Sequence, residues 1–252
     1  MGSWISKGAK ALISRAYYAM SPALKRHTAD LVTRSFEEIT YRRLADRGFR
    51  PAAMIDVGAF HGNWTRLSRR IFGPVPVLMV EAQPALRAEL EKVVSELPGT
   101  SLEIAALGPK SGEEVTFYEM GTGSSYLPEQ SNAVRSERTV TTRTLDEVAG
   151  AVLDGTSPLF LKIDVQGAEL HVLRGGLKTL ERCELVQLEV AMLQYNRGAP
   201  LLPEVVAFMA EHGFLPIEIS GLTRPRAHLV QVDLIFARSG SSLRPEFFDF
   251  GS

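Results

Sequence analysis

Between residues 51 and 213, short apolar runs alternate with longer segments in which apolar residues recur at helical spacing. The runs predict strands at 54–56, 75–80, 102–106, 159–164, 184–190, 214–219 and 229–237, and period-two alternation predicts two more at 114–120 and 140–143. Helices are predicted at 64–72, at 84–97, after a capping box formed by Thr144 and Glu147, over 166–180 and at 201–211. This alternation predicts an α/β fold with a parallel, doubly wound sheet.

Four carboxylates fall at or beside the ends of predicted strands, each on a different strand. They are Asp56, Glu81, Asp164 and Glu189. Parallel doubly wound sheets bind ligands at the carboxyl ends of their strands, near the point where the strand order reverses. One such residue could arise by chance, but four together predict a site at this edge of the sheet.

The first strand leads into a glycine turn, in which Gly58, Ala59 and Gly62 precede a helix. A strand, a glycine turn and a helix together offer backbone N–H groups and the positive end of a helix dipole to a ligand. The spacing lacks the third glycine of a dinucleotide fingerprint, and the lysine of a P-loop is missing. Because Asp56 directly precedes the turn, we expect a ligand with a cationic amino acid end.

Two later segments suit a nucleoside ligand. Glu81 ends the second strand about twenty residues after the glycines, where a carboxylate can accept hydrogen bonds from ribose hydroxyls. The small residues around the turn at 107–109 leave room for a flat adenine ring. We interpret the long polar segment at 121–138 as a mobile cover over the site, with Ser124 and Ser125 as candidate ligand contacts.

Composition narrows the functional classes. The chain has 252 residues and a formal net charge of -1, which favour one large domain and argue against nucleic acid as a partner. Cys183 is the only cysteine, so we expect a buried structural thiol and a reducing, cytoplasmic compartment. No apolar run is long enough to cross a bilayer.

The first fifty residues have their own pattern. Apolar spacing predicts a helix over 28–47, which Gly48 closes as a left-handed cap before Pro51. Residues 1–20 mix aromatic and aliphatic side chains with lysine and arginine, which suits a peripheral membrane contact, packing on the domain, or a homo-oligomer contact. The expected boundaries are 1–50 for a helical extension, 51–240 for the main domain and 241–252 for a tail.

In five segments the chain resembles the FkbM-type family of S-adenosylmethionine-dependent methyltransferases. The segments follow the family's order between residues 54 and 238, and they are Ile55–Thr65, Val80–Pro84, Ala105–Gly108, Thr144–Asp146 and Leu161–Gly175. The last segment is the most specific of them. Two positions depart from the family pattern: Phe60 stands where asparagine is frequent, and Gln166 where glutamate is common.

The resemblance implies a Rossmann-like sheet of seven strands with the last strand antiparallel. It also implies methyl transfer from S-adenosylmethionine to an acceptor, most often a hydroxyl of a sugar, glycan or natural product. By the same resemblance, the turn at Gly58 and Ala59 faces the methionine part of the cofactor, Glu81 the ribose, and Ala105 with Ala106 the adenine.

A hydroxyl acceptor must lose its proton, either to a general base or through a metal ion that lowers its pKa. Asp164 is the first candidate for either role and a candidate cofactor contact, and Glu189 would complete an oxygen-ligand site for Mg²⁺. His61, inside the glycine turn, is a second candidate base. Two other classes stay open: an NAD(P)-dependent oxidoreductase of related fold, and a non-catalytic binding module.

Overall fold

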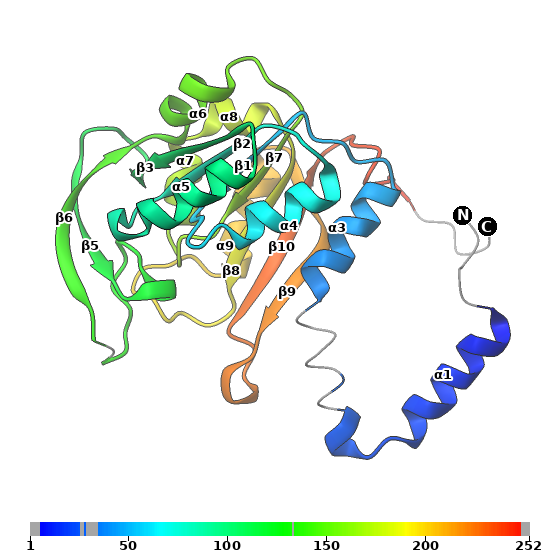
Figure 1. Cartoon of the computed structure of the whole chain (residues 1–252). Helices are drawn as coiled ribbons and strands as arrows, with labels where there is room; N and C mark the ends of the chain where they lie inside the picture. The colour runs from blue at the N-terminus through cyan, green and yellow to red at the C-terminus, as the bar shows by residue number, and fades with distance from the viewer. Residues whose placement is uncertain (1–5, 26–27, 29–34, 133, 248–252) are drawn as a thin grey trace.

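The structure, a computed structural model, describes residues 6–25, 28, 35–132 and 134–247, without the side chains of Lys7 and Lys10. Its centre is a sheet of seven strands (Figure 1), in the order β3 (Thr100–Ile104), β2 (Val77–Glu81), β1 (Ala53–Val57), β7 (Leu159–Ile163), β8 (Cys183–Ala191), β10 (Gln231–Arg238) and β9 (Phe214–Thr223). The pairs from β3 to β8 are parallel, whereas β10 runs antiparallel to both of its neighbours. The expected seven-stranded sheet with an antiparallel last strand is confirmed.

Helices cover both faces of this sheet (Figure 1). One face carries α6 (Leu145–Leu153), α7 (Glu169–Arg174), α8 (Leu177–Glu181) and α9 (Leu202–Glu211), and the other carries α3 (Phe36–Asp46), α4 (Asn63–Phe72) and α5 (Arg87–Glu96). Successive side chains along a strand point to opposite faces of the sheet. Ile55 therefore packs in the core beneath α6 to α9, and Met54 packs in the core beneath α3 to α5. Burial on both faces explains why the central strands are almost uninterrupted apolar runs.

A second, three-stranded sheet lies at one side of the domain (Figure 1), in the order β4 (Ala106–Leu107), β6 (Ser136–Arg143) and β5 (Glu114–Glu119). The apolar run expected as one strand at 102–106 is divided between β3 and β4, which belong to different sheets. Strand β6 begins at Ser136, earlier than the expected residue 140, because it pairs with the whole of β5. A 3-10 turn, η2 (Gly121–Gly123), follows β5.

The single helix predicted over 166–180 is wrong, because the structure has α7 and α8 in its place. A Cβ atom at Gly175 would lie 2.2 Å from the carbonyl oxygen of Gly108, so the chain breaks where the turn after β4 packs against it. The helical segment begins only at Glu169, because Gln166 and Gly167 have φ values of 55° and 93°. A backbone contact that is distant in sequence therefore sets the end of α7, and the left-handed backbone at Gln166 and Gly167 sets its start.

Helix α3 starts at Phe36 rather than at residue 28, and Leu31, which contributed to the longer prediction, lies outside the described residues. Gly48, with φ of 94°, closes it in the left-handed conformation as predicted. Tyr41 and Leu44 are fully buried in the core beneath α4, and Leu243 joins the same core. The boundaries expected near residues 50 and 240 therefore divide elements that pack together.

Two features outside the central layers bear on function. The Cys183 thiol is 1% exposed, and burial raises its pKa to about 12, as suits a structural thiol. Helix α1 (Lys7–Ala19) lies apart from the sheet and its covering helices (Figure 1), and residues 11–19 are all exposed. Within the described residues, no helix has the length and apolar character that crossing a bilayer requires.

Candidate active site

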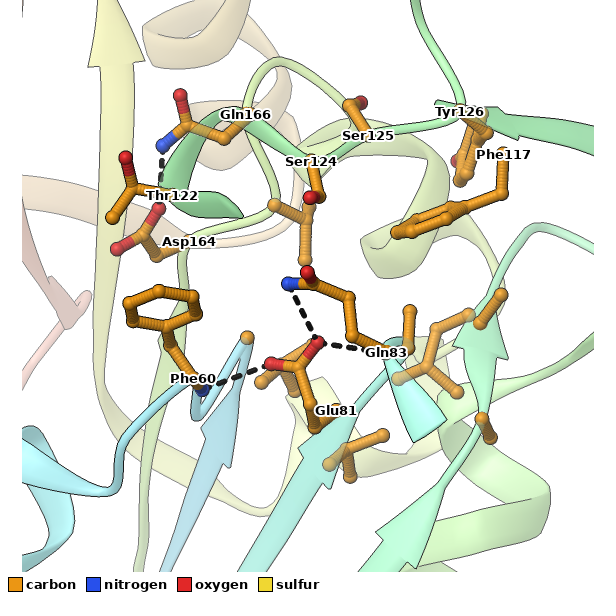
Figure 2. A pocket seen from close by; sticks show the side chains of 18 of the residues that line it. Phe60, Glu81, Gln83, Phe117, Thr122, Ser124, Ser125, Tyr126, Asp164 and Gln166 are labelled. Atoms are coloured by element: carbon orange, nitrogen blue, oxygen red, sulfur yellow. Dashed lines mark hydrogen bonds between the residues drawn. The ribbon is translucent and has the colours of Figure 1, made fainter. Parts of the chain in front are cut away.

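A cavity of about 240 Å³ opens at the carboxyl ends of the central strands (Figure 2). Its walls come from the ends of β1, β2 and β7, from the turn after β3 and from the segment after β5. The predicted site residues that line it are Gly58, Glu81, Ala105, Ala106, Ser124, Ser125, Asp164 and Glu189. The structure thus brings together residues from six separate segments of the chain.

Glu81 is the fixed acidic group of this cavity. Its side chain is buried, and its Oε2 atom accepts a hydrogen bond from the backbone N–H of Phe60 at 2.8 Å (Figure 2). Its Oε1 atom accepts one from the backbone N–H of Gln83 at 2.9 Å. These donors hold the carboxylate in one orientation, and each oxygen keeps acceptor capacity for a ligand.

Gly58 allows two backbone turns to touch. Its φ is 75°, and a Cβ atom there would lie 1.9 Å from the carbonyl oxygen of Asp164. The Lys162 amine secures the contact: Nζ donates to the Gly58 carbonyl at 2.9 Å and lies 3.6 Å from Oδ2 of Asp164. Burial lowers the pKa of Lys162, but the charges of Asp56 and Asp164 outweigh burial and raise it, so the amine stays protonated.

Asp56 and Gly62 do not line this cavity. Asp56 is fully buried, where its Oδ2 accepts from the Thr65 hydroxyl at 2.7 Å and its Oδ1 lies 3.2 Å from Lys162. It therefore supports the glycine turn and does not present the acidic group that we expected a cationic ligand to meet. A Cβ atom at Gly62 would lie 2.8 Å from the Val93 side chain, so this glycine serves packing against α5.

Asp164 and Glu189 converge on the cavity from the ends of neighbouring strands. The Gln166 side chain links them, because its Nε2 donates to Asp164 at 3.0 Å and to Glu189 at 2.6 Å (Figure 2 shows the first bond). Burial, followed by the charges of Asp164 and Asp233, raises the pKa of Glu189 well above its usual range. Burial therefore favours the neutral form of Glu189.

This pair does not fit a magnesium site. Mg²⁺ prefers near-octahedral oxygen ligands, whereas here the NH₂ group of the Gln166 amide lies between the two carboxyl groups and donates to both. Across the described residues, histidine, cysteine and acidic side chains form no group of three that could hold a metal ion. The structure gives no support to the Mg²⁺ site expected at Asp164 and Glu189.

Comparison with known families decides the class of protein. Residues 56–216 match the Methyltransferase FkbM domain family, and this span contains Glu81, Asp164 and Glu189. The chain belongs to the FkbM methyltransferase family. This family is one of methyltransferases and not of NAD(P)-dependent oxidoreductases. Membership in it agrees with dependence on S-adenosylmethionine. A search among curated proteins finds no match.

Solved structures show distant similarity to this FkbM-family chain. Methyltransferase FkbM from Methylobacillus flagellatus KT has a TM-score of 0.49 at 16% identity; the alignment covers 78% of this chain and 47% of that chain. This chain thus spans about half the length of that structure. Magnesium protoporphyrin IX methyltransferase from Synechocystis PCC 6803 has a TM-score of 0.47 at 12% identity, covering 88% and 86%. 1,6-Didemethyltoxoflavin-N1-methyltransferase from Burkholderia thailandensis has a TM-score of 0.44 at 12% identity; the alignment covers 95% of this chain and 93% of that chain.

A second cavity, of about 250 Å³, meets the first in this FkbM-family domain. The two cavities share Gly58, Phe60, Asp164 and Glu189. The remaining wall is mostly polar and lies on the sheet face that α3 and α4 cover. Two cross-strand rows contribute to it. Lys162 on β7 and Gln187 on β8 line the cavity and are in register with Asp56 on β1, which does not line it. In the second row, Glu189 is in register with Asp233.

Helix α3 contributes to the second cavity through Glu37. Its Oε1 atom accepts hydrogen bonds from the Tyr41 hydroxyl at 2.9 Å and from the Gln187 amide at 3.0 Å. Burial raises the pKa of Glu37, and burial with the charge of Asp164 raises the pKa of Asp233 to about 7. The helical extension thus forms part of the site, which its sequence did not indicate.

His61 and Ala59 line the second cavity and not the first. The Nδ1 atom of His61 lies 2.8 Å from Oε1 of Glu89 on α5, and both side chains are partly exposed. The ring also lies against Phe60, with centroids 3.9 Å apart. Asp164, which lines both cavities, is the better placed of the two candidate bases.

Residues 121–126 close one side of the first cavity, in agreement with a cover over the site. The Ser124 hydroxyl accepts from the Met120 N–H at 2.9 Å and donates to the Gly121 carbonyl at 2.8 Å, so it stabilises the turn. Further along, the Gln130 N–H donates to the Tyr195 carbonyl at 2.8 Å, which joins the cover to the loop after β8. Mobility of the cover stays a prediction.

Lys162, Gln83 and Tyr126 belong to the site although the sequence pattern did not single them out. A signal existed for Lys162, because a lysine inside a buried apolar strand requires a charged partner on a neighbouring strand. Gln83 and Tyr126 carried no comparable signal, since each is an ordinary loop residue until the fold brings it to the cavity.

Proposed function

We propose that the protein transfers a methyl group from S-adenosylmethionine to a hydroxyl group of a polar small molecule such as a sugar, a glycan or a natural product. The observation that carries this proposal is the meeting of two different cavities at Asp164 and Glu189. A reaction between two bound molecules needs their reacting atoms in contact at one point, and alignment there supplies a large share of the rate.

The first cavity fits the nucleoside half of the cofactor. Both oxygens of Glu81 are oriented by backbone N–H groups and can accept hydrogen bonds from two ribose hydroxyls. Ala105, Ala106 and Phe117 give the small and apolar surfaces that suit a flat adenine ring. Gly58, shared by both cavities, leaves space for the methionine part. When bound, S-adenosylmethionine supplies an electrophilic methyl group and leaves as a neutral thioether.

The second cavity fits the acceptor, because its polar wall can hydrogen-bond several hydroxyl groups. As the acceptor oxygen forms its bond to the methyl carbon, its proton passes to a carboxylate oxygen of Asp164. Asp164 lines both cavities, and its side chain is 38% exposed. Glu189, whose neutral form burial favours, lies beside it in the wall of both cavities and orients the acceptor oxygen.

Calorimetric titration with S-adenosylmethionine, with NAD as the control ligand, tests the cofactor. We expect micromolar binding of S-adenosylmethionine alone, weakened about 10- to 100-fold in Glu81→Gln, because hydrogen bonds to a charged group contribute about 1.5–3 kcal/mol. The matched control is Glu103→Gln, a carboxylate on β3 outside both cavities, which should leave the affinity unchanged. Binding of NAD alone would overturn the proposal.

Turnover separates a methyltransferase from a non-catalytic module that retains the fold. Thioether product formation is measured with a panel of sugars and hydroxylated natural products, for the unsubstituted protein and for Asp164→Asn. We expect Asp164→Asn to bind the cofactor and to lose activity about 10²- to 10⁴-fold. Cofactor binding with no turnover across the panel would favour the non-catalytic module, and full activity of Asp164→Asn would assign the base elsewhere.

A further inference from the structure

Helix α1 has an apolar side that basic residues flank. It begins at a cap, where the Ser6 hydroxyl accepts from the Ala9 N–H at 3.2 Å. With about 100° of rotation per residue, Leu12, Ile13 and Tyr17 fall along one side of the helix. By the same spacing, the positions of Lys7 and Arg15 fall outside this arc, with Tyr18 between them, and the position of Lys10 falls at its edge beside Tyr17. This is the pattern of a helix that lies at an interface between an apolar and a charged phase.

The apolar side has no cover in the described part of the protein. Leu12 is 70% exposed and Ile13 is 58% exposed. In the described residues, five of the twelve exposed large hydrophobic residues lie between 12 and 24, whereas the other seven come from seven different helices, strands or loops. Packing on the chain's own domain, one of the roles expected for this segment, is therefore not what the structure shows. A gathered apolar surface of this kind marks a contact with a partner.

The charge distribution selects the partner. Residues 1–29 contain five lysines and arginines and no aspartate or glutamate, which leaves 23 basic against 29 acidic residues in the rest of the chain. Two α1 helices packed together would place like charges beside one another. An anionic bilayer instead offers acyl chains to the apolar side and negative headgroups to the basic residues that flank it.

We propose that α1 binds the surface of an anionic lipid bilayer, with Leu12, Ile13 and Tyr17 inserted at the headgroup boundary, and that it holds the methyltransferase domain at the membrane. This role is independent of the cofactor and of the acceptor. It requires only that the apolar side and the basic residues act together on one surface.

Vesicle co-sedimentation of the full chain tests the apolar side. Vesicles of phosphatidylcholine alone are compared with vesicles that also contain phosphatidylserine, at low and at high salt. We expect binding to the anionic vesicles, little binding to the neutral ones, and weakening by salt because the attraction is screened. The double variant Leu12→Gln with Ile13→Gln keeps every charge and should lose at least tenfold in binding.

A second variant tests the basic residues and has a charge-matched control. Replacing Lys7, Lys10 and Arg15 by glutamine should weaken binding on the order of a hundredfold, at about one decade for every 1.4 kcal/mol and about 1 kcal/mol per cation. The control replaces three exposed basic residues of the main domain by glutamine, namely Arg87, Lys92 and Lys110. It should bind vesicles as the unsubstituted chain does.

Three outcomes would overturn the proposal. They are equal binding to neutral and anionic vesicles, equal loss of binding in the charge-matched control, and a dimer that Leu12→Gln with Ile13→Gln dissociates in the absence of vesicles. The last result would assign the apolar side to a second copy of the chain. Titration of each variant with S-adenosylmethionine shows that the domain is folded, so a failure here is distinct from a failure of the proposed methyl transfer.

Discussion

Replacing Lys162 by methionine removes the amine that lies between Asp56 and Asp164 while keeping most of the side-chain volume. The amine is 3.2 Å from Asp56 and 3.6 Å from Asp164, and it donates to the Gly58 carbonyl at 2.9 Å. Asp56 is fully buried. In the variant its carboxylate would keep the Thr65 hydroxyl as a partner but would lose its counter-charge.

The expected loss of stability follows from these distances. At an effective dielectric constant of about 20, two unit charges 3.2 Å apart attract by about 5 kcal/mol. Desolvation of the amine offsets much of this attraction in the native protein, but removal of one partner leaves a buried charge unpaired, which costs about 3–5 kcal/mol. Asp56→Asn should cost less, about 1–3 kcal/mol, because Lys162 keeps Asp164 and the Gly58 carbonyl.

Urea unfolding at pH 7 of the two single variants and of the double variant Asp56→Asn with Lys162→Met measures the coupling. Because the double variant has no unpaired Asp56 charge, its loss should fall short of the sum of the single losses by about 2 kcal/mol or more. Glu38→Gln, in an exposed ion pair with Arg42, is the control and should leave the unfolding midpoint unchanged. Additive losses would refute the view that Asp56 and Lys162 stabilise each other.

Two further predictions concern Glu169 and Gly58. Burial raises the pKa of Glu169 from 4.5 to about 7, so Glu169 in the folded protein holds a proton that it has lost in the unfolded chain in that window. This group alone should therefore lower the free energy of unfolding by about 3 kcal/mol between pH 4.5 and 7. In urea unfolding at pH 5 and pH 8, Glu169→Gln should flatten this dependence and Glu147→Gln should not; an unchanged slope in Glu169→Gln would contradict the assignment. Gly58→Ala should weaken S-adenosylmethionine binding in calorimetry. It should also destabilise the fold by more than the roughly 1–2 kcal/mol that the left-handed conformation costs an alanine, because its Cβ would clash with the Asp164 backbone. The control Gly112→Ala also has a positive φ but nothing within 4 Å, so it should lose only that strain, and equal effects at both positions would count against the close contact.

The carboxyl edge of the sheet was predictable because strand ends can be read from apolar runs. Glu81, Asp164 and Glu189 reach the first cavity as this reasoning predicts. Asp56 does not, because it lies deeper on the same sheet face: it is in register with Met79 and Lys162, two residues before Glu81 and Asp164. All five residues of β1 are buried, so the burial pattern does not mark where along the strand the cavity begins.

Other parts of the site depend on contacts between distant segments. The break between α7 and α8 exists because Gly175 packs against the carbonyl of Gly108. The sequence of neither segment indicates that the two are in contact. Glu37 and Tyr41 read as ordinary residues of an amphipathic helix, and only the docking of α3 on the sheet places Glu37 in the wall of the second cavity. Local pattern predicts the existence of such helices, whereas their position comes from tertiary packing.

The two cross-strand rows on the face beneath α3 and α4 differ in whether their polar groups satisfy one another. In the deeper row, Asp56 pairs with Lys162, and Gln187 bonds to Tyr41 and Glu37, so this row needs no ligand. In the outer row, Glu189 and Asp233 face one another with raised pKa values and line the second cavity. The Gln166 amide donates to Glu189, yet burial and neighbouring carboxylates raise the pKa of both groups, so a donor on a bound acceptor would stabilise their charged forms. We therefore propose that the outer row contacts the acceptor and that the deeper row holds the outer row in place.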